Sequence, residues 1–229
     1  MTDPCETLPA LLLRNAGDRG RAIAIREKEY GVWREVTWAE YGRNVAELAL
    51  GLHELGVRGG DTIGILSDNR PEWAYAVLAA QSLGALPLGL FPDTENLDLL
   101  HHMIAYPGVR YIFVEDQEQT DKVLALAPRL PELRWIIVDN IRELRTYRDA
   151  RLLSLEAVVG RGRSRHEKEP ELFRRLADAV QPDDVAMLCT TSGTTALPKF
   201  PMLTHRNLIL SLRDFDEVAP TAPDDDVLS

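Results

Sequence analysis

The chain has 229 residues, 45% of them hydrophobic, and a formal net charge of −10. The length suffices for one large domain or two small ones, and the apolar fraction is that of a globular protein with a core. Because acidic residues are spread along the chain, the composition argues against a nucleic-acid partner, which would favour a basic face. The one basic run, RGRSRHEK at 161–168, is interpreted as a solvated linker.

The cysteines and the N-terminal segment indicate a cellular location. Cys5 lies near the terminus and Cys189 in an apolar run, so we expect two reduced thiols rather than a disulfide framework. The first 15 residues contain early acidic side chains and only a brief apolar stretch, which does not predict a secretory signal. No apolar run approaches the roughly 18 residues that span a bilayer. The predicted location is the cytoplasm, with peripheral membrane contact left open.

The first elements follow an N-terminal arm at 1–20. Short alternating runs at 22–26 and 32–37 predict a β-hairpin. A helix is predicted over 38–56, because Thr37 with Glu40 three residues later is typical of a helix start and Gly56 of a helix end. Its apolar residues at helical spacing are Tyr41, Val45, Leu48, Leu52 and Leu55.

Strands and helices then alternate. The predicted strands are 62–66, 86–92, 109–115 and 133–139. The predicted helices are 71–84, with Pro71 in its first turn, 97–106 and 116–126. Repeated strand–helix–strand order predicts an α/β subdomain over 21–139, with a largely parallel sheet flanked by helices.

Beyond residue 139 the texture changes. Residues 140–182 are rich in charge and predict a linker with surface helices at 154–159 and 170–180. Residues 183–229 predict a strand at 184–190, a loop, and a helix that Thr204 caps and that runs from His205 to about 215. This part is expected to open the next sheet without completing it. Apolar surface left uncovered there predicts aggregation of the isolated chain.

The loop at 188–205 reads LCTTSGTTALPKFPMLTH. Hydroxyls, backbone N–H groups and a lysine after a strand are suited to hold a phosphate. The common GxxxxGK[ST] pattern does not fit, because Pro198 precedes Lys199 and Phe200 stands where that pattern has a hydroxyl. From the residues alone, a polar loop capped by its own hydroxyls is the alternative.

The stretch TSGTTALPKFPMLTHRNL at 191–208 resembles the phosphate-binding loop of the adenylate-forming superfamily, whose usual pattern is TSGTTGxPKGxxLTHxN. The earlier segment 36–93, which includes DNRPEW and FPD, is similar to the long-chain fatty acyl-CoA synthetase branch. The resemblance covers about 22–229. It implies the N-terminal portion of the adenylate-forming fold, in an AMP-forming acid–CoA ligase.

That resemblance implies ATP, Mg²⁺ and CoA as co-substrates and cofactor, with a fatty acid as the acyl substrate. The carboxylate would attack the α-phosphate to give acyl-AMP and pyrophosphate, and the CoA thiol would then displace AMP. The implied phosphate contacts are Thr191, Ser192, Gly193, Thr194, Thr195 and Lys199. Lys199 is the candidate catalytic cation and Thr191 the candidate magnesium ligand. Catalysis would be largely electrostatic.

The histidines are not expected to take part in this chemistry. His101 and His102 would point about 100° apart on a helix and make a poor metal pair. They are expected to be one exposed and one half-buried histidine. His205 is interpreted as a helix-start residue beside the loop.

The sequence departs from the family pattern at two glycines. Ala196 replaces one, and Phe200 replaces the glycine that follows the lysine, with Pro201 next. Phe200 is tolerable only if its side chain turns outward or into apolar surface. In the family, the adenine contacts, a magnesium-binding Glu and a mobile C-terminal domain lie downstream, so this chain alone is expected to be inactive. A non-catalytic remnant and a ligase for another carboxylic acid are the alternatives.

Overall fold

The centre of the molecule is a seven-stranded sheet. The computed structural model describes residues 7–142, 144–191, 197–220 and 222. Along the sheet the strand order is β7-β6-β5-β3-β4-β8-β9, and only the β8–β9 pair is antiparallel. The strands are β3 (Thr62–Leu66), β4 (Leu86–Leu90), β5 (Val109–Val114), β6 (Trp135–Val138), β7 (Leu152–Ser154), β8 (Val185–Leu188) and β9 (Met202–Thr204). The predicted α/β fold with a largely parallel sheet is confirmed. The expectation that residues 183–229 open the next sheet is wrong, because β8 pairs with β4 and extends the same sheet.

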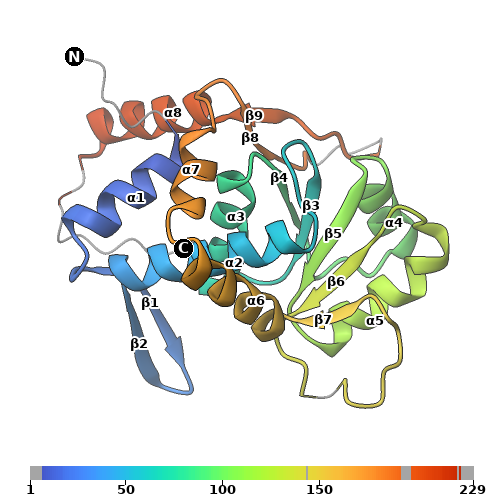
Figure 1. Cartoon of the computed structure of the whole chain (residues 1–229). Helices are drawn as coiled ribbons and strands as arrows, with labels where there is room; N and C mark the ends of the chain where they lie inside the picture. The colour runs from blue at the N-terminus through green and yellow to red at the C-terminus, as the bar shows by residue number, and fades with distance from the viewer. Residues whose placement is uncertain (1–6, 143, 192–196, 221, 223–229) are drawn as a thin grey trace.

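Helices cover both faces of this sheet (Figure 1). Those on one side are α1 (Leu8–Asp18), α2 (Trp38–Glu54), α3 (Pro71–Ser82), α6 (Leu155–Lys168) and α7 (Leu172–Asp178). Those on the other are α4 (Leu97–Ala105) and α5 (Gln117–Leu126), with the short 3₁₀ helix η1 (Ala127–Arg129) after α5. Alternation along β3 explains the two cores, since Ile63 and Ile65 join the first cluster and Leu66 the second.

Short-range sequence signals account for α2 and for the hairpin that precedes it. Thr37 Oγ1 accepts from the Glu40 N–H at 3.3 Å, and the Glu40 carboxylate accepts from the Thr37 N–H at 2.9 Å, so the predicted cap of α2 is present. Gly56 ends this helix region with φ of +96°. The predicted hairpin consists of β1 (Ile23–Glu29) and β2 (Val32–Thr37), turning through Tyr30 and Gly31, both with positive φ.

The charge-rich segment 140–182 contributes more to the fold than its composition suggested. It supplies β7, an edge strand of the sheet, and α6, which packs against α2. The interpretation of the basic run 161–168 as a solvated linker is wrong, because the run forms the C-terminal half of α6. Its small residue Gly162 faces α2 while its charges remain near solvent, and Arg163 pairs with Glu47 at 3.0 Å.

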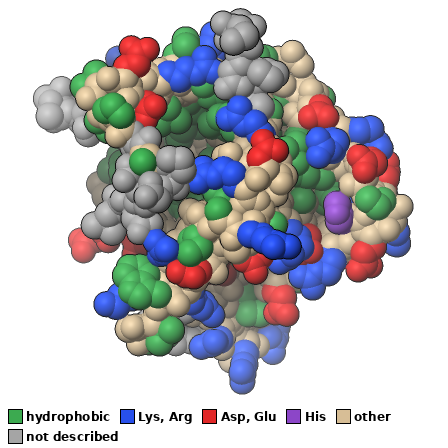
Figure 2. Space-filling view, turned by 90° about the vertical axis from the view of Figure 1, so that its left-hand side faces the viewer, with side chains coloured by type: hydrophobic (Ala, Val, Ile, Leu, Met, Phe, Trp, Pro, Cys, Tyr) green, Lys and Arg blue, Asp and Glu red, His purple; other side chains and the backbone are tan. Residues whose placement is uncertain are grey.

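The last helix of the described residues is α8 (His205–Val218), which packs only partly against the rest of the molecule. His205 and Ile209 are buried in its first turns, whereas Leu212, Phe215 and Val218 are at least 60% exposed. On the face in Figure 2, acidic and basic side chains are interspersed rather than gathered by sign. Among the helices of the described ranges, none is both long and apolar enough to cross a membrane.

Candidate active site

The predicted phosphate loop connects β8 to β9, which pair as an antiparallel hairpin. Beyond β8, the Cys189 N–H donates to the Pro201 carbonyl at 3.0 Å and the Thr191 N–H to the Lys199 carbonyl at 3.1 Å. These bonds continue the β8–β9 pairing up to Thr191. The sequence did not predict β9, which is only three residues long. Ser192, Gly193, Thr194, Thr195 and Ala196 lie outside the described residues.

The two predicted site residues that are described lie opposite each other. Thr191 and Lys199 form an antiparallel bridge, and directly opposed residues in such a pair present their side chains on one face. Both residues are exposed. The Thr191 hydroxyl donates to the Lys199 carbonyl over a long 3.4 Å, so its lone pairs remain available to a ligand. One hydroxyl-bearing and one ammonium-bearing side chain thus leave the same face of the hairpin at the base of the loop.

Phe200 has turned into apolar surface, as its position in the loop required. Its half-buried ring packs against the core cluster that α4 and α5 share with the sheet. It stacks on Tyr106 with ring centroids 5.8 Å apart and lies 5.9 Å from the His102 ring. The phenylalanine that stands in place of the family's glycine has therefore not put a large side chain on the face of Lys199.

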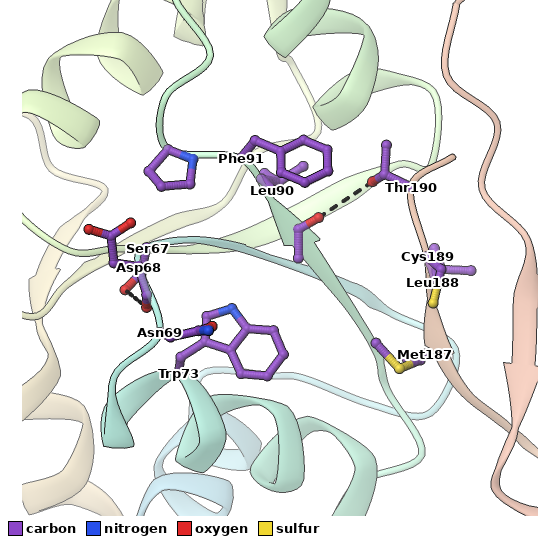
Figure 3. Close-up of a pocket in the computed structure, with 12 residues that line it drawn as sticks. Ser67, Asp68, Asn69, Trp73, Leu90, Phe91, Met187, Leu188, Cys189 and Thr190 are labelled. Carbon is purple, nitrogen blue, oxygen red and sulfur yellow. Dashed lines mark hydrogen bonds between the residues drawn. The ribbon is translucent and has the colours of Figure 1, made fainter. Parts of the chain in front are cut away.

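A cavity of about 650 Å³ lies beside the start of the loop, at the carboxyl ends of β3, β4 and β8. Figure 3 shows Trp73 and Phe91 on opposite sides of it, with Met187 and Cys189 along a third side. The Thr190 hydroxyl at its rim donates to the Gly89 carbonyl at 3.4 Å. The sequence analysis did not predict this lining, although ligands of parallel sheets usually bind at the carboxyl ends of strands.

An ion-pair network closes the neighbouring crevice between β3 and β5. The order β4-β3-β5 reverses direction there, which is where an open α/β sheet usually binds its ligand. Here the Glu115 carboxylate accepts from Arg70 at 3.1 Å, from the Asp68 N–H at 3.0 Å and from the Ser67 hydroxyl at 3.3 Å. The cavity of about 650 Å³ therefore lies on the β4 and β8 side of this network, and a second cavity of about 420 Å³ lies on its other side, next to Asp116 and Asn140.

Asp139 belongs to the same network, at the end of β6. It lies 3.8 Å from Arg70, which also approaches Glu72 at 3.7 Å. Burial raises the pKa of the Asp139 carboxyl to about 6, the nearby Glu72 charge adds to the increase, and Arg70 opposes it. The DNRPEW motif thus gathers the carboxyl ends of three strands around its arginine.

His205 is the first residue of α8, which confirms the prediction of a helix-start residue. Its side chain is 1% exposed, and its Nδ1 accepts a hydrogen bond from the Leu8 N–H at 3.3 Å. Burial lowers the pKa of the ring to about 4. A neutral, buried imidazole that ties α8 to α1 serves structure rather than proton transfer.

The other titratable candidates are distributed rather than clustered. His101 and His102 are both half-buried, and their Nε2 atoms bond different carbonyls, those of Arg129 and Pro198. Cys189 is a free thiol whose pKa burial raises. Within the described part of the chain, no group of three or more His, Cys, Asp or Glu side chains is arranged to hold a metal.

The fold of this chain is also found in solved structures of known proteins. Solved structures with the same fold include apo MbtA of Mycobacterium smegmatis, with a TM-score of 0.76 and 24% identity over 96% of this chain and 37% of that one. The anthranilate CoA ligase AuaEII, solved with anthranoyl-AMP, gives a TM-score of 0.75 and 22% identity, covering 90% of this chain and 36% of that one.

The sequence comparison names the family. The profile of the family described as "AMP-binding enzyme" matches residues 12–229, and the chain belongs to that family. It is 31% identical to the long-chain-fatty-acid–CoA ligase heimdall of Drosophila melanogaster, over 79% of this chain and 26% of that protein. The chain spans between 25% and 30% of the length of several curated long-chain ligases that it matches.

Proposed function

We propose that this chain supplies the ATP-phosphate site of an AMP-forming ligase that activates long-chain fatty acids. The observation that carries the proposal is the bridge between Thr191 and Lys199, which puts a lysine and a hydroxyl residue on one face of the hairpin, next to Cys189 and Thr190 that line the cavity. The curated relatives that are named long-chain ligases favour a long acyl substrate. Structural neighbours were solved with different ligands, anthranoyl-AMP in one and 3-methylaspartate in another, so the fold itself does not choose among acids.

The residues at the base of the loop suit an anion. An ammonium group and a hydroxyl on one face complement phosphate oxygens, and charge-assisted hydrogen bonds are the strong ones in such sites. We assign phosphate contact to Lys199 and Thr191, and by resemblance to Ser192, Gly193, Thr194 and Thr195, whose positions lie outside the described residues. Lys199 would stabilise the charge that develops on the phosphate oxygens during attack by the fatty-acid carboxylate.

Magnesium fits these residues only as a companion of the nucleotide. Mg²⁺ is usually held by one or two carboxylates together with substrate phosphates, and the described base of the loop offers only the Thr191 hydroxyl. When bound with ATP, the metal would neutralise phosphate charge. Thr191 would contribute one oxygen to its coordination, and the phosphates most of the others.

The cavity next to the loop is suited to part of a small substrate. Its walls combine aromatic and aliphatic side chains with Ser67, Asn69 and Thr190, the mixture typical of ligand sites. ATP, the fatty acid and CoA are the proposed small-molecule substrates.

Direct binding tests this proposal. Calorimetric titration of the purified chain with ATP and Mg²⁺ should give saturable binding, and Lys199→Ala should weaken it about tenfold or more, because a hydrogen bond to a charged group contributes roughly 1.5–3 kcal/mol. Binding by neither protein would refute the phosphate site and favour a non-catalytic role. In parallel, incubation with ATP, Mg²⁺, palmitate and CoA should yield no acyl-CoA, because the chain spans only 25% to 30% of the length of the long-chain ligases that it resembles.

A further inference from the structure

The segment that carries Lys199 is attached to α4 by a cluster whose residues are not among the proposed phosphate contacts. The cluster consists of His102 and Tyr106 from the end of α4, and Pro198 and Phe200 from the returning strand of the loop. The His102 Nε2 lies 3.1 Å from the Pro198 carbonyl oxygen. Because a carbonyl oxygen only accepts, the ring nitrogen donates this bond.

Three rings complete the attachment. His102 and Tyr106 lie 5.3 Å apart between centroids, and each contacts Phe200, at 5.9 Å and 5.8 Å. Such separations fall within the range of favourable aromatic pairs. Residues 96 positions apart along the chain are thereby joined on the α4 face of the sheet.

The antiparallel hairpin determines what this attachment does to Lys199. Successive side chains of an extended strand point to opposite faces. When Phe200 is seated against α4, Lys199 therefore points to the other face, where its bridge partner Thr191 also lies. The seating of Phe200 thus fixes the face of the strand from which the Lys199 side chain leaves.

The hairpin has a local reason to need outside support. Pro201 accepts a bond from the Cys189 N–H at 3.0 Å but has no N–H to return one. The His102 bond to Pro198 supplies a second attachment three residues earlier on the same strand. Phe200, at the position where the resembling loops have glycine, gives that attachment its apolar half.

We propose that His102 is a positioning residue of the phosphate site: by holding Pro198 and Phe200 against α4, it keeps Lys199 on the face of Thr191. The inference rests on the proposed phosphate site. The neighbouring His101 provides a matched control, because its Nε2 contacts the Arg129 carbonyl at 3.2 Å, away from the loop.

The test measures Mg²⁺–tripolyphosphate binding by calorimetry, because this probe reports on the phosphate site without adenine contacts. His102→Ala should weaken binding about three- to tenfold, and His101→Ala should leave it unchanged. His102→Gln retains an N–H donor and should fall between the parent and His102→Ala. It also keeps the test usable if the alanine variant does not fold.

A double-mutant cycle separates positioning from general stabilisation. If His102 acts through the lysine, His102→Ala should have little further effect in a Lys199→Ala background. Amide exchange at Thr191, whose N–H bonds the Lys199 carbonyl, should also become several-fold faster in His102→Ala but not in His101→Ala.

Each failure has a distinct meaning. Equal binding by the parent and His102→Ala, or an equal loss in both backgrounds, would overturn the role of His102 while leaving the phosphate site intact. Absence of binding by the parent chain would overturn the phosphate site and, with it, this role.

Discussion

The contact between α2 and α6 provides the sharpest stability prediction. A Cβ added at Gly162 would lie 1.6 Å from the Glu47 carbonyl oxygen and 2.6 Å from the Gly51 nitrogen. Both atoms are backbone, so no side chain can rotate away. Reaching an ordinary contact of 3.4 Å would require the two helices to separate locally by about 2 Å.

The expected cost of Gly162→Ala follows from two opposing effects. Overpacking a well-filled contact costs about 1–3 kcal/mol, and the upper end applies because the backbone itself must move. Replacing a helical glycine with alanine returns about 1 kcal/mol of helix propensity. The net loss is about 2 kcal/mol, which for a chain of this size lowers Tm by about 4–8 °C.

Gly160→Ala is the matched control in the same helix. Nothing lies within 4 Å of a Cβ added there, so only the propensity gain applies. This variant should melt about 2–4 °C above the parent. Thermal unfolding of the three proteins, followed by far-ultraviolet circular dichroism, measures both shifts. If Gly162→Ala melts at or above Gly160→Ala, the close approach of α2 and α6 is wrong.

Three further predictions concern pH and association. The folded pKa of Asp139 is about 6, above the ordinary value of about 3.9, so the free energy of unfolding falls as pH rises from about 4 to about 6. Asp139→Asn should remove that fall and raise the free energy of unfolding at pH 7 by up to about 3 kcal/mol. Urea titrations in which this variant keeps the pH profile of the parent would contradict the prediction. The folded pKa of His205 is about 4, below the ordinary value of about 6.5, so the stability that its neutral ring contributes is lost as pH falls from about 6.5 to 4. In the same titration, the free energy of unfolding of His205→Asn should depend less on pH over that interval. An unchanged pH dependence would refute the burial of a neutral ring. Leu212 and Phe215 are 60% and 62% exposed on α8, so the parent should associate as its concentration rises. The double variant Leu212→Glu/Phe215→Glu should associate less in sedimentation experiments. Identical sedimentation profiles of the two proteins would show that this face of α8 does not cause association.

Local sequence signals determined most of the elements before any tertiary information was needed. The cap formed by Thr37 and Glu40, the glycine after α2, and Pro71 at the start of α3 each act within one turn of the chain. Alternating buried strands and amphipathic helices were enough to predict a largely parallel sheet. The loop sequence was likewise sufficient to indicate the family.

Long-range packing decided the remaining features, because they depend on residues distant in sequence. The charges of α6 concealed the C-terminal half of this helix, in which Gly162 fits against Glu47, more than 100 residues earlier. Similarly, β7 and β9 are each three residues long and are stabilised by pairing with a neighbouring strand. Such short segments contain too little periodicity to predict a strand.

The same distinction applies to the site. The sequence by itself determined which groups are available, with Thr191 and Lys199 as the hydroxyl and the cation. Only the tertiary structure decided that the two residues oppose each other in a bridge, that Glu115 and Arg70 close the crevice beside β5, and that Phe200 rests on α4. The physical reason is that composition fixes chemical character locally, whereas the direction of a side chain is set by the surfaces against which its strand packs.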